Sequence, residues 1–295
     1  VRSLGRPLFF LMCLLMVPVA TAELATDSWI MKLVGPSVEG LGIGAGFAIV
    51  FSAGVMLILR VFAGGVMKHF SPPALLSISG LLSAVGLWWL SGAEVGAAVF
   101  IAFLIYAIGQ TYYWPCILGF TAERYPQGGA LTLNTVSAMG LLSLGVIGAP
   151  ILGVQFDKQI HASLSEKAPA FVEVATAKGA FLGQGHDMIV PAFLVTKEED
   201  ANDNGILDRE ELFDPSSPNS EVLTASWGYM DGLSEEDDAA LRETYAKEDE
   251  LAGRSVLVYA TRFPLMLVFV FGAIFLYFRS KGGYKPIELV EEDAA

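Results

Sequence analysis

The densest set of potential ligands in this chain is a run of twelve residues from Asp200 to Glu211. Oxygen-bearing side chains occupy its first, third, fifth, ninth and twelfth positions, and a glycine occupies the sixth. Calcium takes six to eight oxygen ligands, and this spacing lets one loop supply them, with the glycine permitting a sharp bend. We therefore predict a calcium site with these ligands: Asp200, Asn202, Asn204, the backbone carbonyl of Ile206, Asp208 and both carboxylate oxygens of Glu211.

This spacing is that of an EF-hand loop, and Leu207 stands at the apolar position that normally packs against a partner loop. The sequence offers no second loop, because residues 231–234 lack the ligand spacing. An acidic, turn-rich loop that matches the pattern by chance is the alternative. An exported location would supply abundant calcium and fill even a weak site, which favours an ion that stabilises the loop over one that signals. We expect calcium as a structural ion and no organic cofactor.

Two carboxylates lie in or beside an apolar stretch near the start of the chain. Glu23 and Asp27 are four residues apart, so a helix would place them on one face. Carboxylates in or beside a membrane span are costly and often mark the path of an ion or a proton. We predict a proton-coupling or substrate-binding pair. The alternative is that both lie at the outer end of a helix, in contact with water.

A second group of polar and aromatic side chains precedes Pro115 in another apolar stretch. Flat aromatic faces and amide groups suit sugar-like ligands, whereas an aromatic belt at the membrane surface, combined with packing, is the alternative. The members of this group are Gln110, Tyr112, Tyr113 and Trp114. Asn134 is a further polar candidate, for which a hydrogen bond between helices is the preferred explanation.

Long apolar helices must position these residues. The chain has 295 residues, of which 54% are hydrophobic, more than soluble proteins usually contain. A helix needs about 20 mostly apolar residues to cross a bilayer. Six stretches meet or nearly meet this requirement, and we number them as predicted spans 1 to 6: 7–30, 41–62, 73–90, 95–120, 130–154 and 255–278.

Most of the charge lies in one segment, residues 155–254. It holds 22 of the 31 acidic and 8 of the 18 basic residues, a net charge of −14, whereas the rest of the chain carries +1. This predicts an aqueous surface that attracts cations. Ser234 and Asp237 predict a capped helix from about 235 to 252, ended by Gly253, and 162–179 could form a second polar helix.

Basic residues near the span ends predict the orientation, because cytoplasmic loops carry the excess of lysine and arginine. We expect an integral protein of the cell or inner membrane, with both termini cytoplasmic and 155–254 extracytoplasmic. Residues 1–22 also fit a cleavable signal peptide, which would leave five spans and the same sidedness. The basic residues on the predicted cytoplasmic side are Arg2, Arg6, Arg60, Lys68, Arg124, Arg279, Lys281 and Lys285.

Four segments, 23–29, 60–70, 115–130 and 277–284, carry a family resemblance. They are similar, in this order, to the Glu-x4-Ser-aromatic end of a seventh helix, the Arg/Gly-rich loop between helices 8 and 9, the helix 10 to 11 connection, and the last helix with its tail. The chain thereby resembles the C-terminal six-helix half of a major facilitator superfamily transporter. The branch it resembles most includes the sugar permeases and fucose:proton symporters.

The resemblance covers roughly 1–155 and 255–285. It implies a small-molecule solute as ligand and, because the family has twelve helices in two halves, a missing N-terminal half or a second copy as partner. The first residue is Val1, which fits either a GTG start codon or a fragment. The insertion 155–254 departs from the family, whose loop before the last helix is short.

The resemblance also implies a cytoplasmic gating loop between predicted spans 2 and 3. Its members are Arg60, Gly64, Gly65 and Lys68. The alternative for Arg60 is that a basic residue at a cytoplasmic span end only reflects the positive-inside rule.

The predicted fold class is an all-α membrane protein, half of a major facilitator bundle with a large acidic insertion. We expect a secondary active transporter that moves a sugar or related polar solute by alternating access, with proton coupling. The alternative is a membrane-anchored calcium-binding module without transport. No nucleophile stands beside a base, and no basic block suggests nucleic acid, so we expect neither an enzyme nor a nucleic-acid partner. The predicted domains are 1–154 (spans 1 to 5), 155–254 (insertion, with loop 200–211), 255–279 (span 6) and 280–295 (cytoplasmic tail).

Overall fold

The computed structural model is mostly helical and divides into two compact units. We call residues 1–152 with 256–295 the apolar unit, and residues 153–255 the acidic unit. The boundaries between them fall inside two helices, α9 (Ala149–Lys167) and α13 (Glu235–Ala260). The structure describes these residues: 6–30, 47–93, 97–194 and 219–287.

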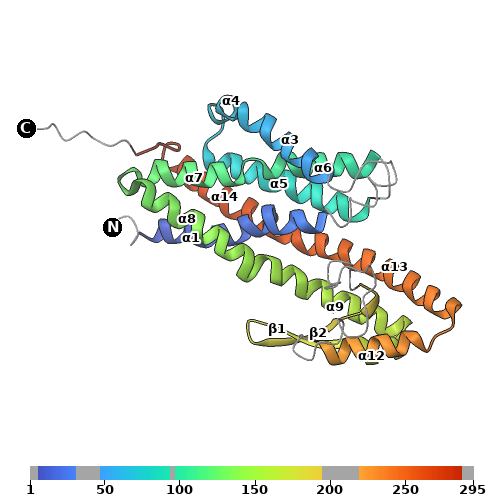
Figure 1. Ribbon diagram of the computed structural model, residues 1–295. Helices are drawn as coiled ribbons and strands as arrows, with labels where there is room; N and C mark the ends of the chain where they lie inside the picture. The colour runs from blue at the N-terminus through green and yellow to red at the C-terminus, as the bar shows by residue number, and fades with distance from the viewer. Residues whose placement is uncertain (1–5, 31–46, 94–96, 195–218, 288–295) are drawn as a thin grey trace, which may run out of the picture. The chain divides into compact units, whose positions relative to one another are not determined.

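The apolar unit consists of helices, several of them interrupted by short turns of another helical type (Figure 1). η1 and η3 are π-helical turns, and η2 is a 3-10 turn. Besides parts of α9 and α13, its elements are α1 (Pro7–Ala20), η1 (Thr21–Ala25), α3 (Phe47–Val61), α4 (Ala63–Met67), α5 (Pro72–Gly92), α6 (Ala97–Gln110), α7 (Tyr113–Arg124), η2 (Pro126–Gly128), α8 (Gly129–Ser143), η3 (Leu144–Gly148) and α14 (Arg262–Ser280).

Five helical segments in the described part of the chain are long and apolar enough to cross a membrane. They contain predicted spans 1, 3, 4, 5 and 6 in whole or in large part, which confirms a mostly helical, apolar chain. Predicted span 2 is represented by a shorter apolar helix, Val50–Val61, and its first residues, 41–46, lie outside the described residues. The five segments are Pro7–Ile30, Pro72–Gly92, Ala97–Arg124, Pro126–Lys167 and Glu235–Ser280.

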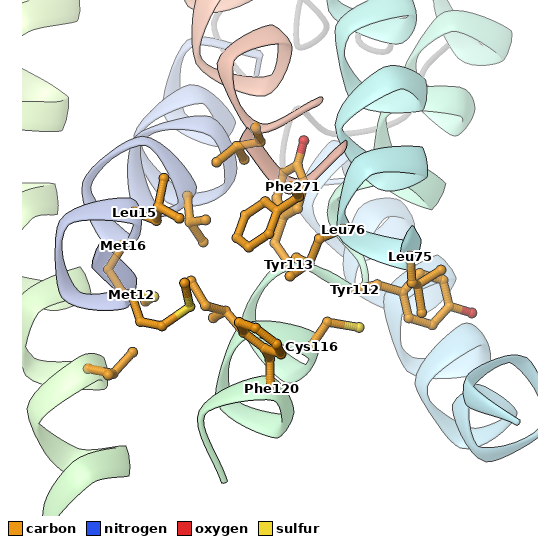
Figure 2. Close-up of a cluster of buried hydrophobic side chains, with 14 of the residues drawn as sticks. Met12, Leu15, Met16, Leu75, Leu76, Tyr112, Tyr113, Cys116, Phe120 and Phe271 are labelled. Carbon is orange, nitrogen blue, oxygen red and sulfur yellow. The ribbon is translucent and has the colours of Figure 1, made fainter. Parts of the chain in front are cut away.

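The helices of the apolar unit pack around one hydrophobic core. α5 packs on α6 and α14, α1 packs on α8, α14 and α7, α3 packs on α6, and α7 packs on α8. Figure 2 shows side chains from several of these helices converging on the core. Its largest fully buried members include Met12, Met16, Tyr113, Phe120 and Phe271.

α5 and α6 approach each other most closely at two glycines. A Cβ atom on Gly86 would lie 2.4 Å from the backbone nitrogen of Tyr106, and one on Gly109 would lie 2.4 Å from that of Ser83. Only a residue without a side chain fits at such distances, and small residues of this kind let apolar helices pack backbone to backbone. The contact at Gly86 therefore fixes the position of Tyr106.

The chain after α14 folds back onto the end of α7. The Tyr284 hydroxyl donates to Glu123 Oε2 at 2.5 Å, and the Ile287 N–H donates to the Glu123 carbonyl at 2.9 Å. The rings of Phe120 and Phe278 pack around the Tyr284 ring. The first part of the predicted tail, 280–295, is therefore packed against the helices, and 288–295 lie outside the described residues.

The acidic unit combines helices with a β-hairpin, which the predicted all-α class did not include. β1 pairs antiparallel with β2, with Thr176 opposite Ile189. A small core of its own includes Leu164, Phe171, Met230 and Tyr245. Besides parts of α9 and α13, its elements are α10 (Pro169–Ala175), β1 (Thr176–Phe181), β2 (Gln184–Ile189), η4 (Ala192–Leu194) and α12 (Ser220–Asp231).

The predicted polar helix 162–179 is wrong as a continuous element. α9 ends at Lys167, and β1 begins at Thr176. A proline disfavours helical backbone at the residue before it, and Pro169 has this effect on Ala168. The hairpin turn places Leu182 and Gly183 at φ of 50° and 77°, the positive values that two-residue hairpin turns require.

The predicted capped helix of the insertion is confirmed at its start and wrong at its end. Ser234 Oγ accepts the N–H of Asp237 at 3.1 Å and donates to the Asp237 carboxylate at 2.6 Å. α13 does not end at Gly253 but continues to Ala260. A glycine inside a helix costs only about 1 kcal/mol, and an apolar helical run begins three residues later, at Val256, so the helix runs on.

Candidate functional site

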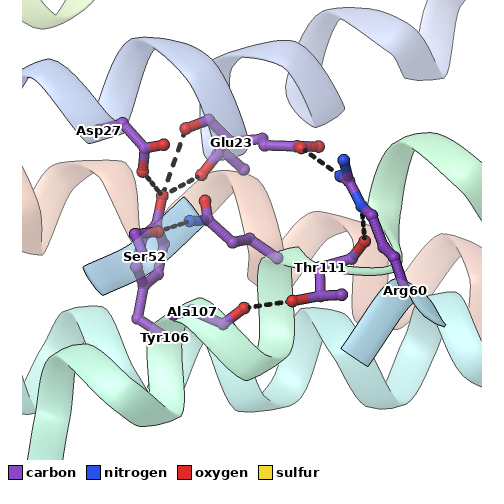
Figure 3. A network of polar contacts seen from close by, with 9 residues as sticks. Glu23, Asp27, Ser52, Arg60, Tyr106, Ala107 and Thr111 are labelled. Atoms are coloured by element: carbon purple, nitrogen blue, oxygen red, sulfur yellow. Dashed lines mark hydrogen bonds and ion pairs between the residues drawn. The ribbon is translucent and has the colours of Figure 1, made fainter. Parts of the chain in front are cut away.

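A network of polar side chains lies inside the apolar unit (Figure 3). It joins three helical segments that are distant in the sequence: η1 with the turn after it, α3, and the junction of α6 and α7. Glu23 is its central carboxylate and is 5% exposed. Charged groups are costly in such surroundings unless they have partners, so the network is the first place to look for function.

Arg60 is the charged partner of Glu23. Its Nη2 lies 3.2 Å from Glu23 Oε1, and the two side chains are 40% and 6% exposed, respectively. Glu23 lies in the π-helical turn η1, in which the Thr26 N–H bonds to the Thr21 carbonyl, one residue further than in an α-helix. π-turns are rare and often occur at functional sites.

Pro115 explains why Arg60 also binds the junction of α6 and α7. A proline has no N–H, so the carbonyl four residues earlier, that of Thr111, loses its helical donor. Arg60 Nε donates to this carbonyl at 3.2 Å. One guanidinium thus satisfies the carbonyl freed by Pro115 and pairs with Glu23, which ties α3 to both neighbouring segments.

Asp27 is held by Tyr106, which lies on α6 and is fully buried. The Tyr106 hydroxyl oxygen lies 3.1 Å from Asp27 Oδ1, 2.8 Å from the Ala22 carbonyl and 3.4 Å from the Glu23 carbonyl. All three acceptors belong to the segment that carries the two carboxylates. The ring of Tyr106 stacks on that of Phe103.

The network has unused hydrogen-bonding capacity. Gln110 Nε2 donates to Ser52 Oγ at 3.1 Å. Gln110 Oε1 and Glu23 Oε2 are buried and have no hydrogen-bond partner among the described residues. Buried polar atoms are nearly always paired, so two open acceptors in one network suggest that a group outside the described residues completes it.

The structure brings together Glu23, Asp27 and Gln110 from the predicted substrate and proton residues. Glu23 is not in contact with water, as the alternative for it required, because it is 5% exposed. Arg60 was predicted in the gating loop, and its described contacts are with Glu23 and Thr111.

The other predicted site residues lie elsewhere in the apolar unit. Tyr112 and Tyr113 belong to its hydrophobic core. Trp114 is half-buried and its ring faces Gly140, while Asn134 is exposed on α8. The remaining gating residues, Gly64, Gly65 and Lys68, are exposed in or just after α4.

Tyr106, Thr111 and Ser52 are network members that the sequence analysis missed. A tyrosine in an apolar helix looks like a core residue, and Thr111 takes part through its backbone carbonyl. Two signals were available. Tyr106 and Gln110 are four residues apart and share a helix face, and Pro115 frees a carbonyl at a known position.

The predicted calcium loop, Asp200 to Glu211, lies outside the described residues. Within the described ranges, no group of three or more His, Cys, Asp or Glu side chains could hold a metal ion. Several charges of the acidic unit that the structure describes form pairs. Lys178 donates to Asp187 across the hairpin and lowers the pKa of that carboxyl.

No protein-family model, no curated protein and no solved structure matches this chain.

Proposed function

We propose that this chain is a secondary active transporter of the major facilitator type, which moves a small polar solute across a membrane by alternating access. The observation that carries the proposal is the network of Glu23, Asp27 and Arg60 inside an apolar helical unit. Ionisable residues are rare within membrane helices, and those that occur there commonly lie on the path of a solute, an ion or a proton.

The packing pattern of the helices supports a major facilitator half. Predicted spans 1 to 6 correspond to α1, α3, α5, α6 with α7, α8, and α14. In an inverted repeat, spans 1, 2 and 3 are equivalent to spans 4, 5 and 6. The α5–α6 contact is then equivalent to the α14–α1 contact, and the α1–α8 contact to the α6–α3 contact. The α5–α14 and α1–α7 contacts each join two equivalent spans. Paired three-helix repeats of inverted topology are expected in each half of this superfamily.

The interruption of predicted span 4 also supports a transport site. α6 ends at Gln110 and α7 begins at Tyr113, so the break lies beside the network. Transporter sites are often formed where membrane helices are broken, because backbone groups freed there can bind ligands. Here the Thr111 carbonyl is such a group, and Arg60 occupies it.

The open acceptors favour a solute that carries hydroxyl groups. Glu23 Oε2 and Gln110 Oε1 can each accept a hydrogen bond, and Arg60 is 40% exposed and can donate. A sugar or a related polyol offers several donors and acceptors at once. We propose a sugar-like metabolite as the solute and a proton as the coupling ion. A second six-helix half, from a preceding segment or a second copy, would enclose the path.

We propose the cell or inner membrane as the location, with both termini cytoplasmic and the acidic insertion extracytoplasmic. Arg279, Lys281 and Lys285 follow the last span, and cytoplasmic loops carry such basic residues. In this orientation calcium in the surroundings would fill the loop 200–211. The ion would stabilise the insertion and take no part in transport.

A membrane-anchored calcium-binding module without transport is the second candidate. The ligand spacing of residues 200–211 favours it. It predicts that calcium changes the fold of the insertion while no solute crosses the membrane. The buried charge network would then have only a structural role.

Uptake by proteoliposomes tests the proposal. The full-length protein is reconstituted, and entry of radiolabelled L-fucose, D-galactose and D-glucose is measured with and without an inward proton gradient. We expect saturable uptake of at least one sugar that the gradient accelerates. Absence of uptake for all three sugars, by protein that binds calcium normally, would favour the second candidate.

A further inference from the structure

The Tyr106 hydroxyl faces more acceptors than it can serve. It lies within hydrogen-bond distance of the Ala22 carbonyl at 2.8 Å and of Asp27 Oδ1 at 3.1 Å. A phenol has one hydrogen to donate and can also accept. A backbone carbonyl can only accept, so the contact with Ala22 uses the hydrogen of Tyr106. A protonated Asp27 supplies a second hydrogen, with which both contacts become full hydrogen bonds.

Charge counting leads to the same residue. With both carboxylates ionised, Glu23, Asp27 and Arg60 together carry a net charge of −1 inside an apolar unit. One proton brings the network to zero, which a poorly solvated site favours. Glu23 has the Arg60 guanidinium beside it, whereas the hydrogen-bond partners of Asp27, Tyr106 and Gln110, are neutral. This difference in partners favours Asp27 over Glu23 as the carboxyl that holds the proton.

The Tyr106 oxygen is fixed in position, so only its hydrogen can change partner, by rotation of the O–H bond. The side chain is fully buried, its backbone is pressed against Gly86, and its ring stacks on Phe103. The other titratable groups around it are Glu23 and Asp27 on the first segment and Tyr113 on α7, and Arg60 of α3 binds Glu23.

We propose that Asp27 carries the exchangeable proton of the network, and that Tyr106 is the positioning residue that follows its presence. When Asp27 is protonated, its hydroxyl donates to the Tyr106 oxygen, and Tyr106 donates to the Ala22 carbonyl. When the proton leaves to water, the Tyr106 O–H rotates and donates to the carboxylate. Tyr106 keeps its own proton throughout. The inference deepens the proposed function by naming the site of proton coupling, and it rests on that function only in treating the proton as transported.

Infrared difference spectroscopy of the full-length protein in liposomes tests the proposal without any solute. Spectra taken across a pH titration are compared for the stretching band of a protonated carboxyl group. We expect the band in the wild type and its loss in Asp27→Asn. In Glu23→Gln the band should appear only at lower pH, because Asp27 and Arg60 alone already sum to zero charge. In Tyr106→Phe the band should persist but shift to higher frequency, because the Asp27 hydroxyl has lost its acceptor. Tyr112→Phe is the matched control and should leave the band unchanged.

A band that persists unchanged in Asp27→Asn, or that appears at no pH in Glu23→Gln, would overturn the assignment of the proton to Asp27. A band unchanged in Tyr106→Phe would overturn the role of Tyr106. If Tyr106→Phe does not fold, ring-labelled tyrosine gives a second measurement. A tyrosine C–O band should then change with pH in the wild type and stay fixed in Asp27→Asn, and a change that survives in Asp27→Asn would contradict the proposal. Because no sugar is added, a failure of sugar uptake alone would count against the proposed function and leave this result standing.

Discussion

The two units of this chain use charge in opposite ways. In the apolar unit the network depends on a few charged groups that come from distant segments, such as Glu23 and Arg60, which are 37 residues apart. In the acidic unit most described ion pairs are local and exposed, between residues four apart on α13 or across the hairpin. The exceptions are the pair of Lys167 and Glu248, 81 residues apart, and the pair of His186 and Asp157, 29 residues apart.

The difference follows from the solvent around each unit. A charge in apolar surroundings is costly unless a partner is in place, so the position of each charge matters. Exposed charges are screened by water and salt, so single pairs contribute little and the total charge matters more. Substitutions of the same type should therefore have large effects in the apolar unit and small ones in the acidic unit.

The largest expected effect is that of Glu23→Gln on sugar uptake. The substitution removes the charged partner of Arg60 and one of the open acceptors. Hydrogen bonds to charged groups contribute about 1.5–3 kcal/mol, so uptake should fall at least about tenfold. Glu236→Gln, an exposed position on α13, is the matched control and should leave uptake unchanged. Equal uptake by both variants would contradict the claim that single charges matter more in the apolar unit than in the acidic unit.

Calcium gives the one large effect expected in the acidic unit. At about 100 times its dissociation constant, a calcium ion bound only to the folded state raises the free energy of unfolding by about 2.7 kcal/mol. Glu211→Gln should abolish this gain, because it removes the two-oxygen ligand. Glu210→Gln changes a neighbour at a non-ligand position and should retain it. Thermal unfolding of the insertion with and without calcium is the measurement.

Helix packing in the apolar unit should tolerate little change where α5 meets α6. Gly86→Ala puts a Cβ atom 2.4 Å from the backbone of Tyr106, whereas a Cβ atom on Gly54 meets nothing within 4 Å. Overpacking costs about 1–3 kcal/mol, so Gly86→Ala should lower the melting temperature in detergent. Gly54→Ala is the same substitution in open space, and a similar loss there would show that the close contact is not the cause.

Lys167→Met tests the pair of Lys167 and Glu248 in the acidic unit. It leaves the Glu248 carboxylate, 3% exposed, without the lysine that binds it. The lysine is 46% exposed and solvent weakens the pair, so we expect a loss of about 1 kcal/mol in the free energy of unfolding. Lys158→Met, at an exposed position on the same helix, should change it less. A loss of equal size in both variants would show that the pair of Lys167 and Glu248 contributes no more to stability than an exposed lysine does.

The smallest effect concerns the exposed pair across the hairpin. Lys178 lowers the pKa of Asp187, so this pair stabilises the hairpin above the unfolded-state pKa of Asp187, and the stabilisation disappears as the pH falls through the lower folded-state value. Hydrogen-exchange protection of β1 and β2 should therefore decrease in acid. In Asp187→Asn the protection should lack this dependence on pH. If protection in Asp187→Asn still decreases in acid, other carboxylates must cause the decrease.

The sequence was sufficient for features that depend on composition or on one local pattern. Apolar stretches predicted the long helices, Ser234 and Asp237 predicted the start of α13, and residue type alone marked Glu23 and Asp27. It was not sufficient for features made by distant partners. Tyr106 becomes part of the site only because α6 packs beside η1, and its sequence neighbours are all apolar.

The same reasoning explains the errors in the acidic unit. Residues 162–179 have a helical composition, but the hairpin depends on backbone angles at Leu182 and Gly183, beyond the predicted helix. Gly253 predicts a helix end. Whether a glycine ends a helix depends on the residues that follow it, and here they continue α13 to Ala260.

The most direct test of the account is whether sugar and proton movement are linked through this network. External pH is recorded in a weakly buffered suspension of liposomes that contain the full-length protein, while an inward gradient of the sugar found to be transported is applied. The account predicts alkalinisation on sugar addition in the wild type and none in Asp27→Asn. Sugar entry in the wild type without any change of pH would contradict proton coupling at this site.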